Sequence, residues 1–521
     1  MNTTPRTRRE FLAHVGQGTL AATVGYELAN GLGLTPAIAE EAPKALDFGP
    51  LEPLVRLMQE TPAKSLLPVL AEKLKGGTEL RTLVAAGALA NARTFGGQDY
   101  IGFHTLMATA PSFHMSKEMP PGQEALPVFK VLYRNTNRIQ DHGGCKSEVM
   151  HAVQPTPLPA GKDAGDALQE AMRKKDMNAA EQMFASLVNG NAEDAFNALL
   201  HMVQDHTEVH RVVLPYRAWD LLGIIGKEQA HALLRQSVRY CVDAEGRNWG
   251  GQYNEPSSLL PKMMDEHKLH DRKPGDRKAE DAWVDKLSQT IFESTPQQAA
   301  AAVAAALAEG MAPADIGEAV TLAANQLVLR DRGRTPEMEV PGKPIGSVHG
   351  DSIGVHACDS ANAWRNMARV GNARNCFASL ILGAYQVALD RVERGGDFLH
   401  WQPMPVEWQI KSMKTTDPDG MLREAEEAIR GNLQARAAAI IHQYGQLNHD
   451  PRGAFNLMLR YAVSEDGALH AEKFYRTCSE EFASTRPAYR WRYLVALARV
   501  TASEYGRPAA GVAEAKELLK V

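Results

Sequence analysis

Alanine and leucine recur at helical spacing along almost the whole chain, and alternating runs of β-branched residues are few. The clearest segment begins at Thr295, which can cap a helix, with Pro296 at the first helical position and Gln298 placed to complete a capping box. Gly310 can end the alanine-rich helix in the left-handed conformation. We therefore expect an all-α fold, a superhelix or toroid of helical pairs, without significant β-sheet.

The chain of 521 residues divides by composition into a leader and three helical regions. We expect a signal peptide over 1–39, an N-terminal helical region over 40–165, a central region over 166–345 and a C-terminal region over 346–521. The central region contains a long loop over 245–277, rich in glycine and aromatic residues. Such a loop in a compact protein is usually functional or disordered, and this composition favours an ordered loop that lines a site.

The leader carries Arg8 and Arg9, then a weakly apolar segment, then the small-x-small triplet Ala37-Ile38-Ala39. This order is typical of a twin-arginine signal, which the twin-arginine translocase reads and which exports folded proteins. We therefore expect a periplasmic or secreted protein that folds, with any cofactor, before export. No later apolar run reaches the length of a membrane span, and the net charge of −5 gives no reason to expect nucleic acid as a partner.

The five cysteines are scattered, without a CxxC or CxxCH motif. This spacing argues against a covalent c-type haem and against a thiolate iron–sulfur cluster. One or two disulfides stay possible in an oxidising compartment, and the spacing does not say which cysteines would pair.

Three short predicted helices each begin with a histidine and carry an aromatic residue two turns later. The pairs are His104 with Phe113, His210 with Trp219, and His356 with Trp364. Each histidine follows a polar or glycine turn and an apolar residue. The recurrence indicates one helical unit used three times, with the histidine at the same place in each.

Histidine is the commonest metal ligand, so three first-turn histidines on one axis would suit a site for iron, zinc or copper. We predict that His104, His210 and His356 form such a site, with open positions for water or substrate. His206 lies four residues before His210 and would share its helical face, and His114 could lie deeper along the same wall. The alternative is that these histidines are separate structural residues.

Further residues on or before the same helices are candidates for contacts to a ligand or a metal-bound histidine. Asp351 precedes His356 and could cap its helix, orient an imidazole or bind the metal. Arg217, Asn362 and Arg365 could contact a polar substrate, or could instead join helices by hydrogen bonds. We expect His470, Lys473 and Arg476, which share one helix, to form a solvated face or an ion-pair ladder.

Several segments resemble known sequences: Gly102-Phe103-His104, His210 to Trp219, Gly354-Val355-His356 to Trp364, and Leu497-Ala498-Arg499-Val500-Thr501-Ala502-Ser503. Together they resemble an uncharacterised family of bacterial proteins that are all-helical and exported by the twin-arginine route. That resemblance spans most of the chain after the signal and implies no activity. The histidine-led helices are also similar to the questin oxidase-like family, helical proteins linked to oxidative ring cleavage, which implies oxidation chemistry.

Two classes of function remain open at this stage. The first is a metal-dependent enzyme, an oxidoreductase acting on a small organic molecule, with a metal-independent hydrolase or lyase that uses the same histidines as its variant. The second is a helical-repeat scaffold that binds a partner without catalysis. The enzyme hypothesis predicts a buried cluster of histidines, and the scaffold hypothesis predicts exposed histidines that do not converge.

Overall fold

The computed structural model describes residues 45–245, 247, 255–340, 344–348, 352–393 and 396–521. The signal predicted for 1–39 lies outside these residues. Contacts divide the chain into two units, Met1–Leu46 and Asp47–Val521, and everything below concerns the second. The division into three helical regions predicted within it stays a prediction.

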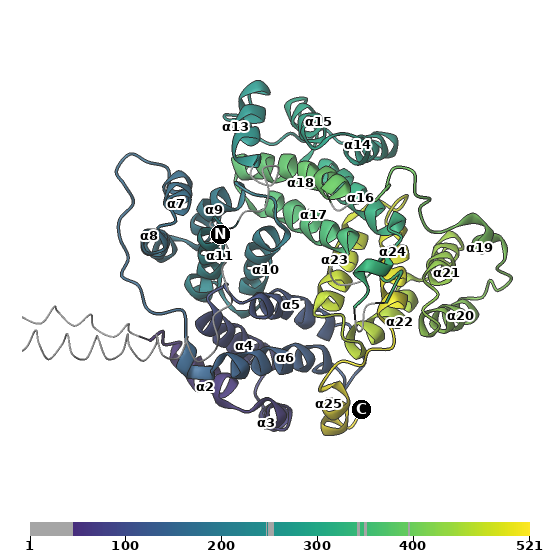
Figure 1. Cartoon of the computed structure of the whole chain (residues 1–521), viewed down its shortest axis with the longest axis horizontal. Coiled ribbons are helices and arrows are strands. Elements are labelled where there is room, and N and C mark those ends of the chain that lie inside the picture. Colours follow the sequence, from purple (N-terminus) through teal and green to yellow (C-terminus); the bar gives the residue numbers. More distant parts are fainter. Residues whose placement is uncertain (1–44, 246, 248–254, 341–343, 349–351, 394–395) are drawn as a thin grey trace, which may run out of the picture. The chain divides into compact units, whose positions relative to one another are not determined.

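The described part of the second unit is built from α-helices joined by turns (Figure 1). Its first helices are α2 (Glu52–Glu60), α3 (Ala63–Lys75), α4 (Leu80–Phe95), α5 (Tyr100–Ser116), α6 (Leu126–His142), α7 (Ala164–Arg173), α8 (Met177–Gly190), α9 (Ala192–Val203), α10 (Val209–Ile225) and α11 (Ala230–Ala244). The next are α13 (Pro256–Glu266), α14 (Asp281–Glu293), α15 (Pro296–Ala308), α16 (Pro313–Arg330), α17 (Ile353–Val370) and α18 (Ala373–Glu393). The last are α19 (Glu407–Lys411), α20 (Pro418–Arg430), α21 (Gln434–Gln446), α22 (Pro451–Ser464), α23 (His470–Ser484), α24 (Trp491–Glu504) and α25 (Val512–Leu519).

The all-α class is confirmed over the described residues, where no strand is found and β-pairing consists of isolated bridges such as Arg277–Met311 and Glu465–Pro508. Short 3₁₀ helices fill some of the turns, at Gly49–Leu51, Gly144–Ser147, Lys227–Gln229 and Pro336–Met338. None of the described helices combines the length and the apolarity that crossing a membrane requires.

Four helices, α5, α10, α17 and α23, surround a common centre (Figure 1), and we call them the inner helices. Contacts join α5 to α10, α10 to α17, α17 to α23 and α23 back to α5, so the four form a closed ring. The other helices pack outside them: α4 and α6 on α5, α11 on α10, α16 and α18 on α17, and α22 and α24 on α23. The finer prediction, a superhelix or toroid of helical pairs, stays a prediction.

Side-chain hydrogen bonds show that the inner helices run in the same direction. Two turns beyond the start of α10, Arg217 donates to Asn362 of α17 at 3.2 Å and to Thr477 of α23 at 3.3 Å. Near the ends of α5 and α10, a ring nitrogen of His114 lies 3.2 Å from a carboxylate oxygen of Asp220. The four helix starts therefore meet at one end of the ring.

Local signals in the sequence explain where these helices begin and end. Thr295 and Gln298 form the predicted capping box at the start of α15, and Gly310 has a φ of +79° just beyond its end. Among the inner helices, Asp99 caps α5, Glu208 caps α10 and Ser352 caps α17. The cap of α17 is thus Ser352 rather than Asp351, which lies outside the described residues.

The prediction of a long loop over 245–277 is wrong over Pro256–Glu266, and residues 246 and 248–254 of that loop lie outside the described residues. The proline at Pro256 starts helix α13, which ends at Glu266 and packs on α15 and α18. Proline and glycine signals had suggested an irregular segment, whereas Leu259, Leu260, Met263 and Met264 give this stretch a buried face at helical spacing.

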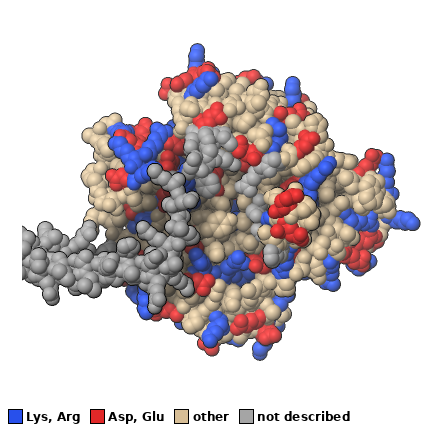
Figure 2. Space-filling view, viewed as in Figure 1, with Lys and Arg blue, Asp and Glu red and all other residues tan. Residues whose placement is uncertain are grey.

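The outer surface mixes charges of both signs. In the space-filling view, lysine and arginine side chains are interspersed with aspartate and glutamate over the visible face (Figure 2). All five cysteines, four buried and Cys145 partly exposed, lie in the described part of the chain and are free thiols, so the disulfides considered from the sequence do not form in this structure.

Acid should destabilise the fold through His231. Burial is the main cause that lowers the pKa of its imidazole to about 4, and the positive charge of Arg235 adds to the effect. An unfolded histidine has a pKa of about 6.5, so the folded state loses stability as the pH falls from 6.5 towards 4, at about 1.4 kcal/mol per unit and roughly 3 kcal/mol in all. Urea unfolding at pH 7 and pH 4.5 measures this. His231→Gln should lose less stability on acidification than the wild type. The matched control His400→Gln, at an 80% exposed position, should behave like the wild type.

Candidate functional site

Four histidines meet at the centre of the ring, one from the first turn of each inner helix: His104, His210, His356 and His470. We call them the histidine ring. Neighbouring imidazoles are in contact around all four sides, with centroid separations of 4.7 Å for His104–His210, 5.9 Å for His210–His356, 5.3 Å for His356–His470 and 5.1 Å for His470–His104. The four side chains are buried, with residue exposures of 3 to 9%.

The predicted convergence of His104, His210 and His356 thus appears in the structure, and His470 joins them. The sequence interpretation of His470 and Lys473 as part of a solvated face is wrong, since both residues are buried. A signal for His470 was present: an apolar residue directly precedes each ring histidine, namely Phe103, Val209, Val355 and Leu469.

The outer nitrogens of three ring histidines are held by hydrogen-bond acceptors. Nδ1 of His104 lies 2.6 Å from the carbonyl oxygen of Tyr100, and Nδ1 of His470 lies 3.0 Å from that of Ala468. Nδ1 of His210 lies 2.5 Å from Oε1 of Glu208. Because carbonyl and carboxylate oxygens only accept hydrogen bonds, each Nδ1 carries a proton, and in a neutral imidazole Nε2 then keeps a free lone pair.

The Nε2 atoms of the four histidines face one another in two pairs inside the ring. The Nε2 atoms of His104 and His210 are 3.2 Å apart, and those of His356 and His470 are also 3.2 Å apart. Two nitrogens that each bind one ion at 2.0–2.1 Å would subtend about 100° at this separation, as neighbouring ligands of a single metal do. Acceptors behind metal-binding imidazoles are the usual supporting contacts in such sites.

Glu208 supports His210 in two ways, as the cap of α10 and as the acceptor for Nδ1. Its carboxylate accepts hydrogen bonds from the backbone N–H groups of His210 and Arg211 and from the hydroxyl of Tyr240. Burial opposes its ionisation, but His210 and these hydrogen bonds more than offset burial and hold the pKa of Glu208 well below its usual range. A charged Glu208 therefore fixes the ring orientation of His210.

A charged layer lies one helical turn beyond the histidine ring, formed by Lys473 of α23 and Asp359 of α17. Burial lowers the pKa of Lys473 to about 8 and raises the pKa of Asp359. Burial, reinforced by the charge of Lys473, also lowers the pKa of His104 and of His470 well below their ordinary value. These two imidazoles are therefore neutral near pH 7, the state in which histidine binds metals.

Aromatic rings cover His104 and His210. Phe103 lies 5.0 Å from each of these two imidazoles, and Tyr100 lies 4.5 Å from His104 and 5.7 Å from His210. Phe103 is buried, whereas Tyr100 is 60% exposed. The outer edge of the site therefore offers an aromatic surface to solvent.

The start of α17 is pressed against its outer neighbour, which fixes the position of His356. A Cβ atom on Gly354 would lie 2.5 Å from the backbone nitrogen of Val328 in α16. A larger residue would push the first turn of α17 away from α16 and shift His356, so glycine is required here for close packing.

Arg217, Asn362 and Arg365 lie deeper than the histidine ring, in a hydrogen-bonded network that joins the inner helices. Arg217 contacts Asn362 and lies 3.5 Å from Glu480, while Asn362 donates to Glu481 at 2.8 Å and Arg365 pairs with the same carboxylate. These contacts correspond to the helix-joining role rather than to contact with the ring histidines.

Two histidines predicted as additional ligands lie elsewhere. His114 is near the end of α5, where with Asp220, Arg81 and Lys117 it lines a separate cavity of about 350 Å³. His206 is not on the helix of His210, because α9 ends at Val203 and α10 begins at Val209. Its Nδ1 accepts a hydrogen bond at 3.1 Å from the backbone N–H of Glu208.

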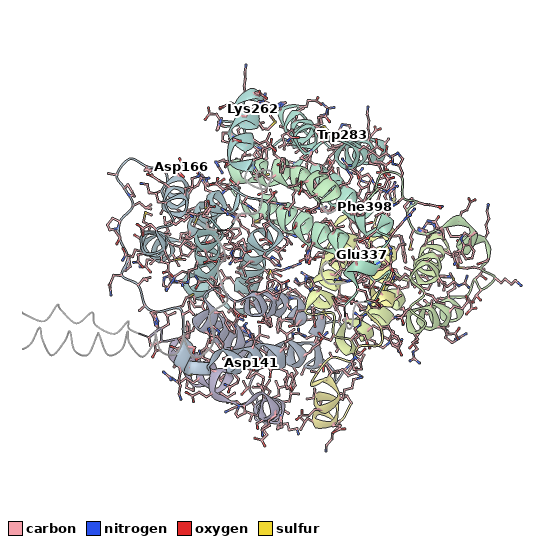
Figure 3. All side chains as sticks on the ribbon, in the orientation of Figure 1. Asp141, Asp166, Lys262, Trp283, Glu337 and Phe398 are labelled. Carbon is pink, nitrogen blue, oxygen red and sulfur yellow. The ribbon has the colours of Figure 1, made fainter. Side chains whose placement is uncertain are left out.

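A second group of possible ligands lies at the surface. Among the described residues, Asp163, Asp166 and His201 form the set in which three potential ligand atoms all lie within 4.8 Å of one another. Figure 3 labels Asp166 on α7, at the periphery of the unit. Asp163 caps α7, and both carboxylates are more than half exposed. We interpret this group as a helix cap with a packed histidine.

Comparison of the chain with known protein families, with curated proteins and with solved structures finds no match. The two family resemblances described from the sequence therefore stay predictions.

Proposed function

We propose that this protein is a metal-dependent enzyme whose ion binds at the histidine ring, and that it is an oxidoreductase acting on a small organic molecule. The observation that carries the proposal is the 3.2 Å Nε2–Nε2 contact between His104 and His210, whose Nδ1 atoms both have acceptors, beside a second 3.2 Å contact between His356 and His470. Two nitrogen lone pairs this close repel each other unless a proton or a metal cation lies between them, and we propose a metal ion in that place.

Oxidation chemistry is favoured by the ligand type and by the surroundings. Imidazole nitrogens suit iron, copper and zinc, and a site with histidine ligands alone keeps positions open for dioxygen, water or substrate. The exposed ring of Tyr100 beside the site suits a substrate with an apolar or aromatic part. The similarity to the questin oxidase-like family points the same way.

Burial and convergence of the histidines favour an enzyme over a scaffold, because a scaffold would leave them exposed and apart. A metal-independent hydrolase or lyase is the second candidate. It is favoured by the 2.5 Å contact between Glu208 and His210, which resembles the carboxylate–imidazole pair of general-base catalysis.

Elemental analysis of the protein, purified without an affinity tag, tests the proposal. We expect about one iron, copper or zinc ion per chain, and loss of activity with chelator that returns when the ion is restored. Turnover that survives complete removal of metal would favour the metal-independent candidate. A chain that binds none of these ions would contradict the proposal.

Export provides a separate prediction, because we propose that the enzyme works in the periplasm or outside the cell. Changing Arg8 and Arg9 together to lysine should leave the precursor in the cytoplasm, since the translocase reads the paired arginines. The measurement is immunodetection of the protein in cytoplasmic and periplasmic fractions. Arg6→Lys is the matched control and should be exported. Unchanged export of the double variant would show that 1–39 is not a twin-arginine signal.

A further inference from the structure

A cavity lies at the end of α16, beside the start of α17. Its volume is about 330 Å³, within the range of small-molecule sites. Its walls come from the turn after α16, the 3₁₀ helix Pro336–Met338, the start of α17 and the segment that follows α18. Figure 3 labels Glu337 in the 3₁₀ helix and Phe398 in the segment after α18. The cavity therefore joins parts of the chain that are far apart in the sequence.

Two aromatic rings contribute to the lining of this cavity. Phe398 is 2% exposed, and its ring lies 4.9 Å from that of Trp401, at an angle of 55°. The backbone carbonyl of Trp401 accepts a hydrogen bond from Arg330 at 2.8 Å, which ties this segment to the end of α16. A Cβ atom on Gly396, where φ is +107°, would lie 2.5 Å from the indole of Trp401, so glycine is required beside this ring. A pair of rings held in this way suits a flat aromatic ligand.

Asp331 gives the cavity a buried carboxylate. It directly follows α16, lines the cavity and is 8% exposed. Its Oδ1 accepts a hydrogen bond at 2.8 Å from the backbone N–H of Gly333. Burial raises the pKa of this carboxyl group, although the Gly333 hydrogen bond and the charge of Arg499 oppose the rise. Oδ2 has no donor among the described residues, so a ligand in the cavity could supply one.

Positive charge near the cavity disfavours a cationic ligand. Arg334 is one of the lining residues, and the guanidinium of Arg332 lies 5.2 Å from the centre of the Trp401 ring. A cation would meet these like charges, whereas a neutral ligand would not. The donor that suits a neutral aromatic ligand best is a ring N–H. It is fixed in the plane of the ring, whereas a hydroxyl group loses rotational freedom when it binds.

We propose that this cavity binds a neutral, planar heteroaromatic molecule through one ring N–H group. The ring packs on Trp401 and Phe398, and the N–H donates to Oδ2 of Asp331. None of the four ring histidines, all of them described, is among the residues that line the cavity. The cavity is therefore a second ligand site, and its ligand does not require a metal ion in the histidine ring.

Isothermal titration calorimetry of the full chain as purified tests this site with two matched probes. Indole carries a ring N–H, and benzofuran has the same fused-ring shape with an oxygen in its place. We expect indole to bind at least ~10-fold more tightly than benzofuran, because only indole donates to Asp331. Asp331→Asn keeps an oxygen for the N–H of Gly333 but puts an NH₂ group in place of Oδ2, so it should lose this preference.

Two tryptophan variants locate the probes. Trp401→Ala should weaken the binding of both about 10-fold, and Trp408→Ala, at a 66% exposed position outside the cavity, should weaken neither. Far-UV circular dichroism confirms that each variant is folded. Equal affinity of the wild type for indole and benzofuran, an unchanged preference in folded Asp331→Asn, unchanged binding by folded Trp401→Ala, or no binding of either probe would overturn the proposal. Each of these results would leave the metal-dependent function standing, because metal content tests that function separately.

Discussion

Replacing His210 by alanine is expected to weaken metal binding at least ~100-fold, a loss of about 2.7 kcal/mol of binding free energy. The change removes one ligand nitrogen and breaks the 3.2 Å pair with His104. It also leaves the buried carboxylate of Glu208 without the imidazole that it orients. Metal titration of the stripped protein measures the affinity, and elemental analysis after dialysis against chelator measures retention.

Two further variants make this result specific. Glu208→Gln keeps His210 but removes the negative charge behind it, so metal affinity should fall about 10–100-fold. His400→Ala changes a histidine that is 80% exposed and paired with Asp397, and it should leave affinity unchanged. The double change of His104 and His210 should add little to either single change, because both act on one site. A full metal complement in His210→Ala would end the proposed function.

Metal should also stabilise the folded chain. An ion that binds only the folded state adds about 2.7 kcal/mol at a free concentration of 100 times its Kd. The Tm of the wild type should therefore rise with added metal, and that of His210→Ala should rise much less.

The fold class could be predicted because helical periodicity and capping are local. Thr295, Gln298 and Gly310 specify the start and end of α15 without help from the rest of the chain. The closed ring of inner helices depends instead on contacts between segments far apart in the sequence, such as α23 with α5. Such contacts cannot be derived from spacing in a single sequence.

Three of the five histidines predicted as metal ligands lie in the histidine ring, and the ring member that was not predicted shows why. His470 was overlooked because the recurrence included an aromatic residue two turns after each histidine, and α23 has Cys478 there. Those aromatic residues have no common role. Trp364 is buried and donates to Gln386, whereas Trp219 stacks on Phe196.

Burial explains why the prediction of a solvated face at Lys473 was wrong. Lys473 lies on a helix face with charged neighbours in the sequence, which is typical of a solvated face. In the fold this face points into the ring of inner helices, and only tertiary packing decides that. The prediction that His206 shares a helical face with His210 assumed one continuous helix. In the structure α9 ends before His206 and α10 begins after it, so the two histidines are not on the same helix.

Arg217→Ala is expected to lower the free energy of unfolding by about 3–5 kcal/mol, because it leaves buried partners without their cation. Arg217 is 1% exposed and contacts Asn362 of α17 and Thr477 and Glu480 of α23, two other inner helices. Burial opposes its charge, but Glu480 and other nearby acidic groups more than offset burial and keep its pKa above the usual value. Urea unfolding followed by circular dichroism measures the loss.

The same variant separates a structural role for Arg217 from a catalytic one. Since Arg217 lies two turns beyond the histidine ring and bonds to neighbouring helices, folded Arg217→Ala protein should keep its bound metal. Arg217→Lys retains the charge but not the planar fork, so it should fall between the wild type and alanine. Lys174→Ala, which removes an exposed pair with Glu170, is the surface control and should cost less than about 1 kcal/mol. Wild-type stability in Arg217→Ala together with lost turnover would assign Arg217 to substrate binding instead, because only a contact made to substrate could then explain the defect.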